Sequence, residues 1–299
     1  MAELSPSTGD RPKQAPSPDR SPLFCDTVLA ERIERVEATL MAKAAAAAHR
    51  RTADPAGFVI DLSGGVATCA DPGSPFNKIA GLGFDGVPDA AALDAVERAF
   101  ASRGAAVQVE LANLGDPAIA AFLTGRGYQL LSFENVLGRS LREERRAEPP
   151  PGIDVRLSGD DEFDAWLDAV IEGVGHPDTQ GVASHEEYPR QVIDDAERDF
   201  AAAGVVRYAA LIDGTLAGGA GMHLADGIAQ LTGAATVPRY RRRGVQTSLL
   251  SARLADAARA GCDIAVVTTQ PGSKSQQNVQ ARGFDLLYTR AVLVKQPDP

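Results

Sequence analysis

The chain has 299 residues, of which 44% are hydrophobic and 23% are charged, an average composition for a globular protein. At roughly 150 residues per domain, this length predicts two domains. The formal net charge of −10 disfavours nucleic acid and an anionic membrane surface as partners, because both carry negative charge themselves.

The N-terminal part of the chain predicts a tail followed by a mixed α/β domain at residues 23–140. Residues 1–22 contain five prolines and scattered charges, so they bury too little apolar surface to become ordered, and we expect a disordered tail. Apolar residues at helical spacing predict a first helix over residues 23–51. The elements predicted after it are strands at 58–62, 66–70, 77–82, 106–111 and 128–137, and helices at 90–102 and 118–124.

A connector and a second α/β domain follow. Residues 139–152 are charged and then proline-rich, which predicts a linker at 141–151 and a second domain at 152–299. Asp213-Gly214 lies between two apolar runs and predicts the tight turn of a hairpin. The elements predicted here are strands at 153–157, 205–212, 215–223 and 230–236, and helices at 161–173, 186–203 and 246–260.

The second half repeats the pattern of the first. Gly127–Leu137 aligns with Gly283–Leu293 at an offset of 156 residues, and the glycines that end the preceding helices, Gly104 and Gly261, differ by 157. A period this long indicates a duplicated domain rather than a solenoid, whose repeats span roughly 20–50 residues. We therefore expect two similar α/β (α+β) domains, each with a central mixed, mostly antiparallel sheet flanked by helices.

The cysteines and the apolar runs bear on the compartment. Cys25, Cys69 and Cys262 lie far apart and form neither a disulfide framework nor a paired metal-binding motif. No apolar run reaches the roughly 18 residues of a membrane span, and the N-terminus lacks the apolar core of a secretory signal. We expect a cytoplasmic protein that needs no metal.

The loop at residues 237–245 carries the strongest chemical signal. It leads from a strand into a helix, and Arg241–Arg243 and Gly244 lie where that helix begins. A helix N-terminus offers unpaired N–H groups to an anion, and a glycine lets the anion approach the backbone closely. A diphosphate suits this arrangement, and the alternative is a solvated basic turn before a surface helix.

The corresponding loop of the first half lacks these features. The repeat places Val87 where Gly244 stands, within residues 84–90, which contain two aspartates and no basic residue. Pro88 also removes one amide donor. Gly81–Gly86 formally matches a dinucleotide-binding pattern, but a tight turn is the favoured interpretation. An oxidoreductase that uses a dinucleotide depends on that pattern alone.

The second half resembles the GNAT superfamily of N-acetyltransferases. Arg241-x-x-Gly244-x-Gln246 is similar to the cofactor motif of that family, with Gln246 standing where glycine or alanine is usual. Residues 237–240 resemble the segment before the motif, and residues 275–284 resemble the last helix and strand entry. The resemblance spans about residues 150–299, and the repeat extends it to the first half as a degenerate GNAT-like copy without a cofactor loop.

The resemblance implies that acetyl-CoA binds between two strands of the second half. By position, the backbone of Ala234–Thr236 would meet the pantetheine arm and acetyl carbonyl, backbone amides of Arg242–Thr247 would hold the pyrophosphate, and Asn278 would contact the pantetheine. The cofactor-binding residues implied are Ala234, Ala235, Thr236, Arg241, Arg242, Arg243, Gly244, Val245, Gln246, Thr247 and Asn278.

Catalytic groups are harder to assign from the sequence. Val279 stands where many family members carry a tyrosine acid, and Gln230 stands where some carry a glutamate base. The remaining candidates are His223, Tyr288 and Ser275, each of which is equally suited to packing or capping. Two further histidines, His176 and His185, lie in the loop between the first two helices of this half, and proton transfer through water is an alternative.

We therefore expect an acetyl-CoA-dependent N-acetyltransferase that acts on an amine of a small molecule, with a peptide as the second choice. Direct attack in a ternary complex is expected, because no cysteine lies in the loop to carry the acyl group. The acidic loop at 174–188 would suit a cationic amine, although a solvated surface explains it equally well. The alternative function is a non-catalytic acyl-CoA-binding or interaction module, and a homodimer is left open.

Overall fold

A computed structural model describes residues 22–54, 57–142, 152–176 and 188–297. The predicted tail and almost all of the predicted linker lie outside these residues. Asp26 caps the first helix by accepting a hydrogen bond from the amide of Leu29, 2.8 Å away. The first half consists of α1 (Thr27–Thr52), β1 (Phe58–Leu62), β2 (Gly65–Cys69), β3 (Lys78–Ala80), α2 (Ala90–Ala101), β4 (Val107–Ala112), α3 (Pro117–Gly125) and β5 (Gln129–Ser140).

The second half follows the predicted order of elements closely. Asp213 and Gly214 both have positive φ, 51° and 75°, as the hairpin turn between two of its strands requires. Its elements are β6 (Ile153–Leu157), α4 (Phe163–Val174), α5 (Arg190–Ala202), β7 (Val206–Ile212), β8 (Thr215–Ala225), β9 (Ile228–Thr236), α6 (Val245–Arg259), β10 (Ile264–Thr269), α7 (Lys274–Gln280) and β11 (Asp285–Lys295).

The strands of both halves join in one sheet. Among the described residues it has eleven strands in the order β1-β2-β3-β4-β11-β5-β10-β9-β8-β7-β6. The mixed α/β class with flanking helices is confirmed, and the sheet is continuous across the two halves. The last strands are exchanged: β11 lies against β4 of the first half, and β5 lies against β10 of the second half.

The exchanged strands pair with each other at the centre of the molecule. β5 and β11 are antiparallel, and their register places Glu134 directly opposite Arg290. These two residues are also equivalent in the sequence repeat, because they are 156 positions apart. The approximate twofold axis that relates the halves therefore passes between them.

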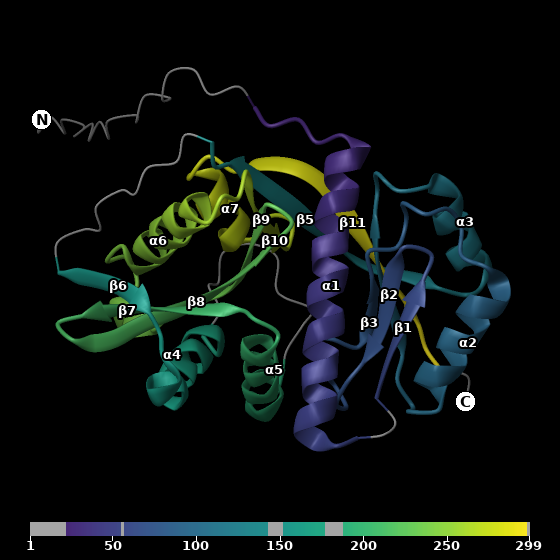
Figure 1. Cartoon of the computed structure of the whole chain (residues 1–299), viewed down its shortest axis with the longest axis horizontal. Coiled ribbons are helices and arrows are strands. Elements are labelled where there is room, and N and C mark those ends of the chain that lie inside the picture. The colour runs from purple at the N-terminus through teal and green to yellow at the C-terminus, as the bar shows by residue number, and fades with distance from the viewer. Residues whose placement is uncertain (1–21, 55–56, 143–151, 177–187, 298–299) are drawn as a thin grey trace, which may run out of the picture.

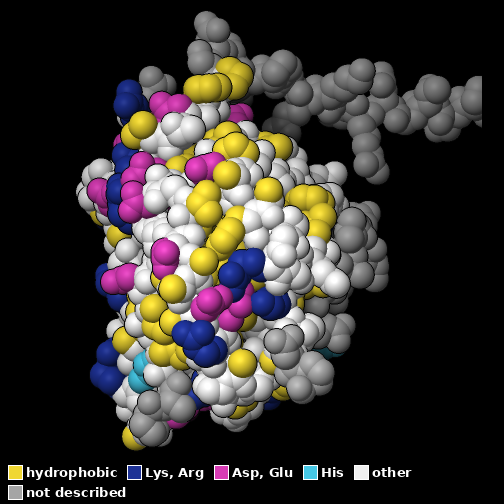
Figure 2. All heavy atoms as spheres, turned by 90° about the vertical axis from the view of Figure 1, so that its right-hand side faces the viewer, with side chains coloured by type: hydrophobic (Ala, Val, Ile, Leu, Met, Phe, Trp, Pro, Cys, Tyr) yellow, Lys and Arg dark blue, Asp and Glu magenta, His cyan; other side chains and the backbone are white. Residues whose placement is uncertain are grey.

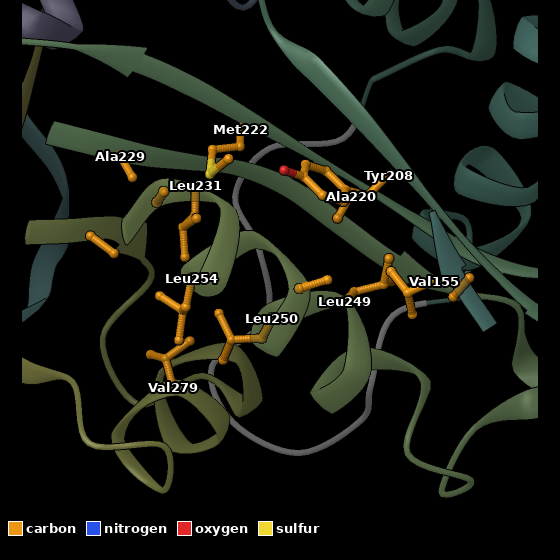
Figure 3. Close-up of a cluster of buried hydrophobic side chains, with 14 of the residues drawn as sticks. Val155, Tyr208, Ala220, Met222, Ala229, Leu231, Leu249, Leu250, Leu254 and Val279 are labelled. Carbon is orange, nitrogen blue, oxygen red and sulfur yellow. The ribbon is translucent and has the colours of Figure 1, made fainter. Parts of the chain in front are cut away.

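Helices cover both faces of the sheet. In β7, Tyr208 and Ala210 pack into the core beneath α6, whereas Ala209 packs against α4 on the other face. Figure 3 shows Leu254 of α6 beside Leu231 of the sheet, and Leu249 of α6 beside Val155. Burial of these apolar side chains fixes α6, and with it the loop that precedes α6.

α1 runs along the middle of the molecule between the two halves (Figure 1). Its buried side chains enter two core clusters, one with Phe76 and Ala196 and the other with Val136 and Ile264. The helix thereby contacts elements of both halves. None of the helices in the described part of the chain combines the length and apolar character needed to cross a membrane.

Candidate active site

The site is built around a place where two neighbouring strands separate. β9 and β10 are paired in parallel only over residues 228–230 and 264–266. Beyond Gln230, β9 continues alongside β8, and beyond Val266, β10 continues alongside β5. The strands therefore leave an opening between Leu231–Thr236 on one side and Val267–Thr269 on the other, called the β9–β10 opening below.

A β-bulge shapes the β9 side of this opening. Gly221 pairs with Thr232 and Ala220 pairs with Ala234, so Gly233 is the extra residue. A bulge leaves backbone polar groups outside the ladder, free to meet a ligand. Arg253 of α6 fixes the bulge from behind, because its Nη1 donates to the carbonyl oxygens of Gly221 at 3.0 Å and Thr232 at 3.2 Å. Burial lowers the pKa of Arg253 to about 10.

The helix that follows presents an uncapped N-terminus. Gly244 precedes α6 at φ 95°, and no side chain caps the helix. Arg242 also has a positive φ of 63°. Positive φ angles at Arg242 and Gly244, on either side of Arg243, direct successive N–H groups toward one point, and this geometry binds phosphate. The first turn of α6 therefore keeps its amides available for an anion, as the sequence motif predicts.

A cavity of about 280 Å³ lies between the opening and helices α6 and α7. Its walls include five of the predicted site residues: Ala234, Gln246, Thr247, Ser275 and Asn278. The Asn278 amide donates to Gln246 Oε1 at 2.8 Å, so the unusual glutamine of the motif holds the predicted pantetheine contact in place. We call this space the cofactor cavity.

Arg282 and Arg253 also line the cofactor cavity and were not predicted from the sequence. Arg282 is exposed, and its Nη2 donates to Thr247 Oγ1 at 2.8 Å beside the first turn of α6. Arg282 directly precedes Gly283-Phe284, and this position next to a recognised motif could have indicated its place beside the cavity. Arg253 lies in the middle of a helix, and its contacts to the bulge could not be read from the sequence.

The other predicted cofactor residues do not line this cavity. Arg241 donates to the carbonyl oxygens of Gly173, at 3.1 Å, and of His176, which ties the loop to the end of α4. Arg243 lies over the ring of Tyr240. Ala235 and Val245 are buried in the core, so only their backbone groups are available for the predicted contacts, whereas Arg242 is exposed.

The three catalytic candidates lie in different surroundings. Ser275 is exposed and lines the cofactor cavity. Tyr288 is buried outside both cavities and donates to Glu34 Oε1 at 2.6 Å, and burial raises its pKa well above 10. His223 is also buried away from them, its Nδ1 has no partner among the described residues, and burial lowers its pKa. His185 lies outside the described residues.

A second cavity, of about 230 Å³, opens on the other side of the β9–β10 opening. It shares Leu231, Thr232 and Gly233 of β9 and Val267 and Thr268 of β10 with the cofactor cavity. Its remaining walls come from α1, α5, the β2–β3 loop and strands of both halves, including Arg290 of β11, so it lies between the two halves. We call it the inter-half cavity.

Charged side chains gather on the first-half wall of the inter-half cavity. Lys78 Nζ lies 2.6 Å from Glu110 Oε1. Arg290 reaches all four carboxylates of the group: its nitrogens lie 2.7 Å from Glu34, 3.6 Å from Glu110, 3.7 Å from Glu134 and 3.9 Å from Glu37. Within the described residues, four carboxylates thus face two cations.

Glu134 is the carboxylate of this group with the weakest pairing. It accepts no hydrogen bond from the part of the chain that the structure describes, and its only ion pair is the 3.7 Å contact to Arg290. Burial and the neighbouring Glu110 raise its pKa from 4.5 to about 8, against the opposing effect of Arg290 and Lys78. Sequence reasoning missed Glu134, although the repeat already makes it equivalent to Arg290.

Comparisons with known proteins agree with this geometry. Residues 172–284 match the model of the acetyltransferase (GNAT) family. No curated protein matches the sequence. A GCN5-related N-acetyltransferase from Kribbella flavida has a similar structure, with a TM-score of 0.63 and 19% identity over 91% of this chain and 96% of that one.

Two further solved structures share the fold. A tandem GNAT protein from the clavulanic acid biosynthesis pathway has a TM-score of 0.58 and 16% identity, and the match covers 93% of this chain and 98% of that one. A GCN5-related N-acetyltransferase from Sphaerobacter thermophilus has a TM-score of 0.51 and 16% identity over 70% of this chain and 67% of that one. Residues 172–284 thus match the acetyltransferase (GNAT) family, and the chain as a whole has a fold like that of tandem GNAT proteins.

Proposed function

We propose that the protein is an acetyl-CoA-dependent N-acetyltransferase that acts on an amine of a small molecule by direct attack in a ternary complex. The observation that carries this proposal is the pair of cavities on opposite sides of the β9–β10 opening, which share five wall residues. Two substrates bound in separate spaces can react through such an opening.

The cofactor cavity fits acetyl-CoA. Amides at the first turn of α6 would hold the pyrophosphate, and Asn278 and Gln246 would contact the pantetheine arm. When bound, acetyl-CoA supplies an acetyl group activated as a thioester. The backbone freed by the bulge at Gly233 would stabilise the oxyanion that forms on the acetyl carbonyl. Ser275 is the wall residue that could give a proton to the departing sulfur.

Direct transfer is supported by the positions of the cysteines. Cys25, Cys69 and Cys262 are all described, and none of them lines either cavity. An acyl-enzyme on cysteine would need a thiol at the opening. Initial rates at varied acetyl-CoA and amine concentrations should therefore give intersecting reciprocal plots, whereas parallel plots would contradict a ternary complex.

The test is release of CoA thiol from acetyl-CoA by the full chain with a panel of amines. Gly233→Ala should lower kcat/KM about 10- to 100-fold, because the new methyl group stands where the cavities meet. Apart from the two neighbouring residues in the chain, the atom of the described residues within 4 Å of that methyl group would be Glu197 Oε1 at 3.7 Å, so the fold tolerates it.

The matched control is Gly125→Ala on α3, where an added Cβ meets nothing within 4 Å. Its kcat/KM should equal that of the wild type. Binding of acetyl-CoA without thiol release from any amine would instead favour an acyl-CoA-binding module.

A further inference from the structure

The inter-half cavity has features that the acetyl-CoA site alone does not require. It adjoins the cofactor cavity, but its charged wall belongs to α1, β3, β4, β5 and β11, which lie at the junction of the halves. The first half, which lacks a cofactor loop, therefore builds the space that faces the thioester. A role of this cavity in acceptor binding rests on the proposed acetyl transfer.

The charges of the cavity wall are not balanced. Glu37, Glu110 and Glu134 line the space together with Lys78 and Arg290, and Glu34 lies behind Arg290. Burial raises the pKa of Glu34, so this group holds a proton more readily than an ordinary carboxyl. With Glu34 neutral, three carboxylates face two cations once Glu134 has ionised, and a ligand with one positive charge then completes the balance.

Two buried polar atoms also lack partners at this wall. Glu110 is 98% buried, and its Oε2 accepts no hydrogen bond from the described residues. Gln230 Oε1 is likewise buried without a hydrogen-bond donor, while the Gln230 amide donates to Glu37. Buried acceptors without donors are costly, so they indicate a ligand that brings N–H groups.

Gln230 also fixes where such a ligand would lie. It is the last residue of β9 that pairs with β10, so its side chain stands where the β9–β10 opening begins. Glu134 lines the same cavity from β5, and 19% of its side chain is exposed there. An ammonium group held between these side chains would lie next to the shared wall residues, on the path to the thioester.

The rest of the wall is apolar. Leu40 and Met41 of α1, Pro75 and Phe76 of the β2–β3 loop, and Phe200 of α5 line the cavity. No described cation of the wall is free to pair with a carboxylate of the ligand, because Lys78 and Arg290 are both engaged by glutamates. The volume of about 230 Å³ lies below the roughly 300–1,000 Å³ of pockets for drug-sized ligands.

We propose that the inter-half cavity binds the acceptor, a small primary amine with a compact apolar body and no carboxylate, and that Glu134 of the first half is the general base. Glu134 removes one proton from the ammonium. The neutral amine nitrogen then forms the C–N bond to the acetyl carbon, and the thioester C–S bond breaks. The nitrogen now carries one proton more than the amide product, and this proton passes to the sulfur to give CoA thiol. Glu134 finally releases its own proton to water.

The first experiment compares three primary amines that differ in charge, with the full chain and acetyl-CoA. 2-Phenylethylamine should show a kcat/KM at least about 100-fold above phenylalanine, which adds a carboxylate that the wall repels, and above cadaverine, which places a second ammonium on the apolar wall. Equal or reversed preferences would overturn the assignment of the acceptor class.

The second experiment tests Glu134 itself. Glu134→Gln should lower kcat/KM for 2-phenylethylamine about 100-fold or more, with the Kd for acetyl-CoA unchanged within about twofold. In the wild type, kcat/KM should rise with pH up to about 8, as Glu134 ionises. In the Glu134→Gln variant, the midpoint of this rise should move to a higher pH, toward the pKa of the free amine. Burial and the charges of Glu110, Arg290, Lys78 and Glu37 set the pKa of Glu134, and Glu34 faces the same group through its ion pair with Arg290.

Glu197 of α5 provides the competing assignment. Its pKa is also raised, to about 7 by burial, and it lies close to Gly233. If Glu197→Gln removes the rise in rate with pH and Glu134→Gln does not, the role of Glu134 is disproved.

Failure of the proposed function gives a different result. If the wild type binds acetyl-CoA and acetylates no amine, the acceptor site is decided by calorimetry with 2-phenylethylamine in the presence of CoA. Binding that weakens at least tenfold in Glu134→Gln supports the site, and equal affinity for both proteins overturns it.

Discussion

The two halves begin an equivalent helix in opposite ways. α2 of the first half is capped by Asp89, whose carboxylate accepts from the amide of Ala92 at 3.0 Å. α6 of the second half follows Gly244 and has no side-chain cap. A capping carboxylate satisfies an amide and adds negative charge, so the first half has closed the position that the second half leaves open for an anion.

The exchanged strands also differ between the halves, here with the carboxylate in the first half and a basic side chain at the equivalent position of the second half. Glu134 on β5 and Arg290 on β11 are equivalent in the repeat and face each other across the approximate twofold axis. Arg290 is 2% exposed and pairs with several carboxylates, whereas Glu134 borders a cavity. The second half thus carries an arginine where the first half carries a carboxylate, and the first half carries a capped helix where the second half has an uncapped one.

The surface of the first half agrees with this division. Figure 2 faces the end of the molecule that carries α2 and α3, and basic side chains there lie beside acidic ones instead of forming a patch of one sign. Arg126, for example, is paired with both Asp94 and Glu97. Among the described residues, the open helix N-terminus with arginines around it belongs to the second half.

The largest expected effect comes from giving α6 a carboxylate at its N-terminus, as α2 has in Asp89. Gly244→Asp should raise the Kd for CoA about 100-fold or more, because a carboxylate would face the pyrophosphate, and calorimetry measures this. Gly244→Asn is the control for the positive φ of 95°, which asparagine tolerates, and it should cost far less. Val87→Asp in the first-half loop should leave the Kd unchanged. A wild-type Kd in Gly244→Asp would contradict the site.

The second prediction tests the pairing of Arg290. Arg290→Met should lower the free energy of unfolding by about 3–5 kcal/mol, because it leaves buried carboxylates without their cation. Urea denaturation followed by circular dichroism measures the change. Arg198→Met removes an exposed pair with Asp194 and should cost at most about 1 kcal/mol. Equal losses in the two variants would show that the central charges contribute little to stability.

The smallest expected effect concerns Glu134 and pH. Its pKa rises from 4.5 in the unfolded chain to about 8 in the folded one, so the folded state keeps a proton that the unfolded chain has released. The stability that depends on this proton is fully present below about pH 4.5 and is lost as the pH rises through 8.

Glu134→Gln removes this dependence. The variant should melt a few degrees, roughly 2–4 °C, above the wild type at pH 9, and close to it at pH 5. Scanning calorimetry at both pH values provides the measurement, and a difference in Tm that does not change with pH would exclude the raised pKa.

Much of this arrangement was predictable from local sequence. Helical spacing, Asp213-Gly214 and the motif ending at Gly244 each act over a few residues, so the elements and the phosphate loop followed from the chain alone. The pairing of Glu134 with Arg290 depends on strands that are far apart in the sequence. The repeat revealed their equivalence, but repeat logic predicted a separate sheet for each half, and only the sheet order shows the exchange that joins them.

The same limit explains the catalytic candidates. His223 and Tyr288 have residue types suited to proton transfer, yet both side chains are buried outside the cavities. A side chain's direction on a strand depends on register, which a bulge such as that at Gly233 changes. The role of Arg241 was also hidden, because its hydrogen bonds go to the distant end of α4.

The exchange of β5 and β11 also has a consequence for how the chain folds. β5 is synthesised well before β10 and β11, the two strands that flank it in the sheet. The edge of β4 therefore stays unpaired until β11 has been synthesised. Contacts this distant in sequence slow folding, and unpaired edges invite aggregation in the interval. Both halves are thus completed when β11 is added. Truncation that removes β11 would expose the edges of β4 and β5 at once.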